Sequence, residues 1–100
     1  MEPELFNAFG HKSEFIKRFR QRRKEAGFTQ KELAEKAKVS WSSLKRFELT
    51  GEISFSALVR LFYVLGYEAD LDRLMDQTAY RTRDDLEKAN QRYFRLLSGS

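Results

Sequence analysis

Cysteine is missing from this 100-residue chain, and proline and histidine each occur once. Without cysteine the chain can form no disulfide, no thiolate nucleophile and no cysteine-ligated zinc site. No apolar run comes near the roughly 20 residues that a membrane-spanning helix needs, and the acidic N-terminus MEPELFNAF is unlike a signal peptide. We therefore expect a cytoplasmic protein without membrane contacts or disulfide bonds.

Catalytic and cofactor-binding patterns are missing as well. The lone His11 has no metal ligands grouped with it, and the chain has no Gly-rich phosphate loop and no Ser-His-Asp set. The adjacent Asp84 and Asp85 are better explained as the acidic start of a helix than as a catalytic pair. We therefore predict that the chain is not an enzyme and holds no metal or cofactor.

Positive charge, in contrast, is plentiful and is concentrated in the first half of the chain. The formal net charge is +4, but residues 11–46 contain 12 Lys/Arg against 4 Asp/Glu, a net charge of +8. Residues 66–100 contain 6 against 7, a net charge of −1. Such a basic region is what a nucleic-acid-binding protein needs, because neutralisation of phosphates supplies most of the non-specific affinity for nucleic acid. On charge alone, a solubilising surface explains the pattern equally well.

The hydrophobic pattern predicts one compact, mostly helical domain. Hydrophobic residues make up 41% of the chain and include nine Phe, which is enough for a core, and the scarcity of proline favours helices. We predict a lead-in ended by Gly10, a helix capped by Ser13 that ends near Ala26, and five helices in the first 76 residues. Later helices are expected at residues 29–37, 40–49, 54–65 and 70–75, with a sixth from residue 83 after a loop over 76–82.

Residues 28–48, FTQKELAEKAKVSWSSLKRFE, predict two short helices joined by a tight turn. Thr29 and Glu32 have the spacing of a capping box, and Ser40 can cap the second helix. The small Ala34 suits the close approach of two steeply crossing helices. Opposite an apolar inner face, the second helix is expected to present side chains that suit a DNA major groove. These outward side chains are Trp41, Ser42, Ser43, Lys45 and Arg46.

These motifs resemble the phage-repressor/Cro-like (XRE-type) helix-turn-helix family over roughly residues 13–76. The matching stretches are FIKRFRQRRKEAGFTQKELAEKAKVSWSSLKRFE and TGEISFSALVRLFYVLGY. The resemblance implies an all-α, five-helix repressor-like domain, here with a C-terminal helical extension. It also implies a transcriptional regulator that binds double-stranded operator DNA as a homodimer, through a recognition helix at residues 40–49. The chain would then divide into a lead-in (1–12), a DNA-binding domain (13–76) and an extension (77–100).

The resemblance also implies which residues contact DNA. An Arg at position 46 can donate a fork of hydrogen bonds to guanine, worth roughly 1–3 kcal/mol of discrimination. Lys45 is expected on phosphate, and the Ser40 hydroxyl, if it is more than a cap, suits a phosphate as well. The residues at base-contacting positions are Trp41, Ser42 and Arg46, with Ser43 beside them.

Other matched residues are expected to support the recognition helix or to contact the DNA backbone. Arg23 and Glu48 match a recurring pair that joins the first helix to the end of the recognition helix. Gln30 matches a residue that contacts a phosphate and braces the recognition helix. The basic face of the first helix is either a solvated surface or a backbone contact, for which Lys17 and Arg20 are the candidates.

Two positions depart from the family pattern. Lys38 stands where many members have Gly, and a left-handed conformation there would cost on the order of 1 kcal/mol. Trp41 stands where a polar residue is common, and its single donor cannot form a bidentate contact to adenine. Trp41 either packs against a thymine methyl group or a sugar, or folds down on the protein.

Large apolar residues near the C-terminus exceed what so small a core can cover. Surplus apolar surface suggests a dimer or partner interface, for which the candidates are Tyr80, Tyr93, Phe94 and Leu97. The tail sequence YRTRDDLEKANQRYF is similar to small repressor-like proteins that include bacterial antitoxins. The alternative function is therefore an antitoxin that binds a cognate toxin protein and represses their shared promoter. A third interpretation, a helix-turn-helix fold that has lost DNA binding, conflicts with the basic recognition surface.

Overall fold

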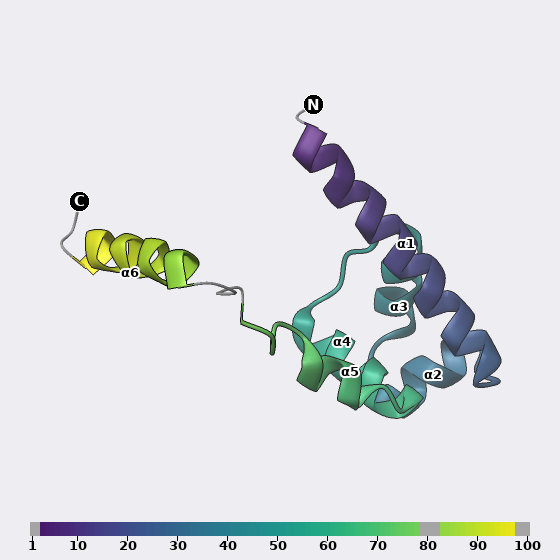
Figure 1. Ribbon diagram of the computed structural model, residues 1–100. Helices are drawn as coiled ribbons and strands as arrows, with labels where there is room; N and C mark the ends of the chain where they lie inside the picture. The colour runs from purple at the N-terminus through teal and green to yellow at the C-terminus, as the bar shows by residue number, and fades with distance from the viewer. Residues whose placement is uncertain (1–2, 79–82, 98–100) are drawn as a thin grey trace.

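The computed structural model of the protein describes residues 3–78 and 83–97, which form six helices and no strand. This confirms the predicted all-α fold with five helices before the extension and one within it. Figure 1 shows the order of the helices along the chain. Their bounds are α1 (Pro3–Glu25), α2 (Gln30–Ala37), α3 (Trp41–Thr50), α4 (Phe55–Leu65), α5 (Glu68–Arg73) and α6 (Arg83–Leu97). None of these helices is both long and apolar enough to cross a membrane.

The caps predicted from sequence explain where the middle helices begin and end. Thr29 Oγ1 accepts from the Glu32 amide at 3.1 Å, and the Glu32 carboxylate accepts from the Thr29 amide at 3.0 Å. Hydrogen bonds from the Thr29 backbone and side chain to the Glu32 carboxylate hold the pKa of Glu32 below its ordinary value. The Ser40 and Ser54 hydroxyls cap α3 and α4 in the same way. The predicted capping box and both serine caps are therefore confirmed.

The first helix is longer than predicted. The expected start at Ser13 is wrong, because α1 begins at Pro3 and passes through Gly10 without a break. Proline is favoured at a first helical position, where its missing N–H has no partner to lose. Gly10 lies in open space, with nothing within 4 Å of where a Cβ would be. Its cost of about 1 kcal/mol relative to Ala is too small to end a helix of 23 residues.

The fifth helix is shifted from its predicted range of 70–75 to Glu68–Arg73. Gly66 ends α4 in a left-handed conformation, and the Tyr67 amide donates back to the Phe62 carbonyl at 2.8 Å. The chain therefore turns within two residues and restarts as a helix earlier than the apolar spacing indicated. Leu74 and Met75 fall beyond the end of α5 and are exposed.

The core lies where α1, α2, α3 and α4 meet. Its aromatic centre is formed by α1 and α3, since the Phe19 and Phe47 rings meet edge to face at 4.9 Å between centroids. The buried apolar residues are Phe19, Leu33, Ala34, Ala37, Val39, Leu44, Phe47, Ala57 and Leu61. Helices pack in the pairs α2 with α4, α2 with α3, α1 with α3 and α4 with α5. Helix α6 is in none of these pairs and stands apart in Figure 1.

Candidate nucleic-acid interface

Helices α2 and α3 are joined by the three residues Lys38–Ser40, which form a tight turn. Lys38 is left-handed, with φ 56° and ψ 42°, and its amide donates to the carbonyls that end α2. The Val39 amide donates to the Ala34 carbonyl at 2.9 Å, and the Val39 side chain is buried. Lys38 thus adopts the left-handed conformation that glycine takes without steric cost. The turn fixes the direction in which α3 leaves α2.

Helix α3 has a buried face and an exposed face. Its inner residues, Leu44, Phe47 and Glu48, are buried. All of the outward residues are exposed, including Leu49, whose relative exposure of 83% is unusual for a leucine. The exposed set of α3 is Trp41, Ser42, Ser43, Lys45, Arg46, Leu49 and Thr50. The outer face is therefore polar and basic, with an apolar residue near each end.

Trp41 lies on the surface near two lysines from different helices. The residue is 47% exposed, with Lys45 Nζ at 4.6 Å and Lys31 Nζ at 5.6 Å from the ring centroid. Such cation–π contacts hold an ammonium group over the ring. The ring therefore has two positive charges near it, one from α2 and one from α3, at the start of α3.

The serine hydroxyls at the start of α3 are close together. Ser40 Oγ accepts from the Ser43 amide at 3.1 Å, lies 2.6 Å from Ser43 Oγ and lies 3.3 Å from Ser42 Oγ. All three residues are exposed. The cluster therefore caps the helix and still presents hydroxyl groups to solvent.

A buried ion pair fixes the far end of α3 to α1. Arg23 donates through Nε to Glu48 Oε2 at 2.7 Å and through Nη2 to Oε1 at 2.9 Å, and both residues are buried. Arg23 Nη1 also donates to the Phe28 carbonyl at 2.9 Å, which adds the loop before α2. A bidentate pair of this kind is directional and positions both partners.

Gln30 and Arg20 also approach Glu48. We call these residues, together with the Arg23–Glu48 pair, the brace. Gln30 Nε2 donates to Glu48 Oε1 at 3.0 Å, so this side chain is engaged with the brace. Arg20 Nε lies 3.6 Å from the same oxygen, and its side chain is half exposed. Lys17, one turn earlier on α1, is exposed. The structure thus brings Arg20, Arg23, Gln30 and Glu48 into one cluster, whereas Lys17 lies outside it.

Arg46 has a partner that the sequence did not indicate. Its Nη2 lies 2.5 Å from Glu52 Oε2, and both side chains are exposed. Glu52 is held in place because its amide donates to Thr50 Oγ1, which itself donates to the Arg46 carbonyl. The loop after α3 therefore presents a carboxylate to the guanidinium proposed to contact bases.

Sequence reasoning also missed Lys31 and Leu49. Helical spacing relates residues three or four apart, whereas Arg46 and Glu52 are six apart across a helix end and Lys31 reaches Trp41 from another helix. No signal in the sequence predicted these contacts.

Of the predicted dimer or partner residues, Tyr80 lies outside the described residues, and Tyr93, Phe94 and Leu97 are exposed on α6.

Comparison with known proteins gives one match. A helix-turn-helix family model matches residues 19–71, which is more than half of the chain and includes α2, the turn and α3. The chain belongs to the helix-turn-helix family. No curated protein and no solved structure matches the chain.

As a helix-turn-helix protein of the XRE type, the chain has the fold of a DNA-binding transcription regulator. Domains of this family are regulatory and bind DNA, and they typically have no enzymatic activity. In the part of the chain that the structure describes, no group of His, Asp and Glu residues could hold a metal ion.

Proposed function

We propose that this helix-turn-helix protein is a sequence-specific repressor that binds operator DNA as a homodimer in the cytoplasm. In this proposal residues 13–76 read the DNA, residues 77–100 join the two chains, and residues 1–12 are a lead-in whose described part belongs to α1. The single observation that carries it is the division of α3 into a buried face, held by the Arg23–Glu48 pair, and an exposed basic face. A helix so presented can enter a major groove without disturbing the core.

The proposed contacts follow from the positions of the side chains. Arg46 and Ser42 read base edges from the outer face of α3. Trp41 contacts a thymine methyl group or a sugar, while Lys31 and Lys45, which lie near its ring, meet phosphates. The Ser40 and Ser43 hydroxyls also bind phosphate, and Gln30 contacts a phosphate from the edge of the brace. Lys17 and Arg20 contact the backbone from α1.

Selection of bound sequences from a random duplex pool tests this proposal with two variants. Arg46→Ala should remove the base preference at one position of each half-site, at a cost of roughly 1–3 kcal/mol for the preferred base. Lys17→Ala, the matched control, should weaken binding to all sequences about equally. A wild-type protein that selects no sequence contradicts the proposal, and an Arg46→Ala variant with unchanged preferences removes Arg46 as a base reader.

The second candidate function is an antitoxin that neutralises a toxin protein and represses their shared promoter. The exposed apolar residues of α6, among them Tyr93, Phe94 and Leu97, favour it because such a surface suits a protein partner. Co-expression with the product of the neighbouring gene and purification of the pair would test it. A neighbouring protein that neither binds the chain nor is toxic without it would count against this candidate.

A further inference from the structure

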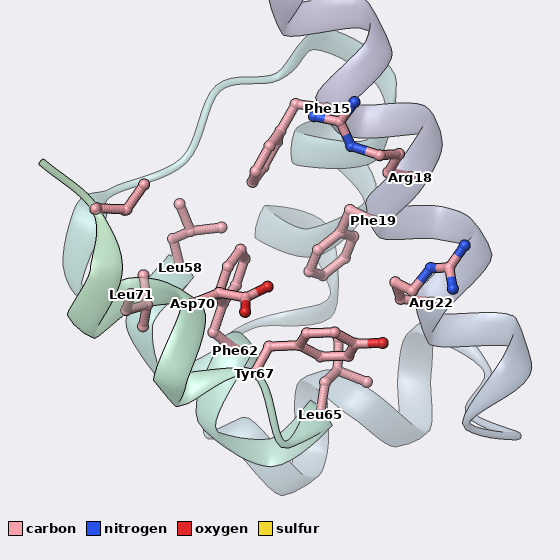
Figure 2. A pocket seen from close by; sticks show the side chains of 11 residues that line it. Phe15, Arg18, Phe19, Arg22, Leu58, Phe62, Leu65, Tyr67, Asp70 and Leu71 are labelled. Carbon is pink, nitrogen blue, oxygen red and sulfur yellow. The ribbon is translucent and has the colours of Figure 1, made fainter. Parts of the chain in front are cut away.

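Among the residues that the structure describes, we consider two uncovered apolar surfaces, and one of them is a groove between α1 and the α4–α5 hairpin. The groove has a volume of about 600 Å³. Figure 2 shows Phe15 and Phe19 of α1 beside Phe62 of α4. The rings of Phe15 and Phe62 stack at 5.9 Å between centroids, and both side chains line the groove. Leu58, Leu65, Leu71 and Leu74 add to the apolar lining, and Arg18 and Arg22 line it from α1.

The other uncovered surface is a face of α6. Leu86, Ala89, Tyr93 and Leu97 lie along one side of this helix, and Phe94 and Leu96 widen the apolar stripe toward its C-terminus. The five large residues of this stripe are exposed. An isolated helix of 15 residues is marginal in water, because most helical stability comes from packing of the apolar face. Helix α6 therefore requires a surface to pack against.

We propose that α6 of a second copy of this chain fills the groove, so that two chains exchange their C-terminal helices. The groove takes several large apolar side chains, which is what the stripe of α6 offers. The proposal deepens the dimeric part of the proposed function and rests on it.

The shape of the chain favours exchange between copies over packing of α6 in its own groove. The radius of gyration is 18.2 Å, against about 13 Å for a compact domain of this length. Helix α6 lies outside the domain formed by α1–α5 (Figure 1). A chain whose C-terminal helix packs on a partner chain extends away from its own domain in this way. Mutual exchange also fills both grooves around one two-fold axis, which closes the assembly at a dimer.

The first test measures the mass of the full chain in solution, without DNA, by sedimentation. A dimer of the 11.9 kDa chain is expected. Phe94→Asp in the stripe and Leu74→Asp in the groove should each weaken dimerisation at least ~10-fold, because each charges a contact otherwise buried. Both side chains are exposed in the single chain, so neither substitution should unfold the domain formed by α1–α5. Tyr63→Asp, which charges an exposed position of α4 outside the groove, is the control and should leave the dimer intact.

Crosslinking then identifies the occupant, and the lack of native cysteine makes single-cysteine variants unambiguous. Leu74→Cys chains grown in heavy isotopes are mixed with light Phe94→Cys chains and treated with a short bis-maleimide. Heavy–light products joining positions 74 and 94 are expected. The proposal would be overturned by a monomeric wild type or by a dimer that is crosslinked only between the two positions 94. It would also be overturned if a chain carrying both Leu74→Cys and Phe94→Cys crosslinked these two positions within itself.

Failure here is distinguishable from failure of DNA binding. No step of the mass or crosslinking measurements involves DNA, and a monomeric helix-turn-helix protein would still select a half-site from a duplex pool. A dimer that survives both charged variants but binds the neighbouring gene's product through α6 would also overturn the exchange and favour the antitoxin.

Discussion

Arg23 is the residue on which the position of α3 most depends. Its guanidinium holds both oxygens of the buried Glu48 carboxylate and the carbonyl before α2. Replacing Arg23 by Ala would strand a buried charge, since Gln30 and the more distant Arg20 only partly compensate. Breaking a buried pair in this way costs about 3–5 kcal/mol.

We therefore expect Arg23→Ala to lower the melting temperature by more than about 10 °C and to weaken operator binding. Thermal unfolding followed by circular dichroism measures the first effect. The double variant Arg23→Met/Glu48→Leu is the control, because replacing both charges by apolar groups should restore most of the stability. A melting temperature unchanged in Arg23→Ala would show that the brace does not support the fold.

Glu52 lowers the effective positive charge that Arg46 presents to DNA. We expect Glu52→Gln to bind operator more tightly and to steepen its salt dependence, because the substitution removes a negative charge that repels phosphate and frees Arg46 to contact a base edge. Stability should hardly change, since exposed ion pairs contribute about 0–1 kcal/mol. Titrations at several salt concentrations measure the slope. Asp72→Asn on α5 removes the same charge away from α3, and an equal effect from it would argue against a local role for Glu52.

At the scale of elements, the turn between α2 and α3 stores strain at Lys38. A left-handed conformation costs a residue with a Cβ roughly 1–2 kcal/mol, whereas glycine adopts it freely. Lys38→Gly should therefore stabilise the protein by roughly 0.5–1 kcal/mol after allowing for its more flexible unfolded chain. The melting temperature should rise by a few degrees. Lys38→Ala keeps the Cβ and should show no rise; if it matches the glycine variant, backbone strain is not the cause.

Sequence-based prediction worked where structure depends on neighbouring residues. The Thr29–Glu32 capping box and the Ser40 and Ser54 caps are local, so the starts of three helices were predictable. The predicted break at Gly10 is wrong because one glycine in open space costs a long helix too little to end it. The Arg23–Glu48 pair came from family resemblance, since no periodicity relates residues 25 positions apart. Glu52 was missed because its contact with Arg46 depends on how the loop after α3 folds back.

At the scale of the molecule, the unequal distribution of charge predicts a strong dependence of binding on salt. Residues 11–46, which include α2 and most of α3, have a net charge of +8. A dimer neutralising several phosphates per protomer should lose ~10³-fold or more in affinity between about 50 and 200 mM salt. Fluorescence anisotropy with a labelled operator duplex measures this. A nearly flat dependence would mean that this charge does not face the phosphate backbone.

The two faces of α3 have a consequence for how such a regulator can change its target. The side chains that seat the helix, Leu44, Phe47 and Glu48, are separate from the exposed ones that meet solvent. The outer side chains can therefore be substituted without changing the packing of the core. Such substitutions can change which DNA sequence the protein prefers while the fold keeps its stability. A gene duplicate would diverge toward another promoter through a few codons of α3, and a designer can follow the same route.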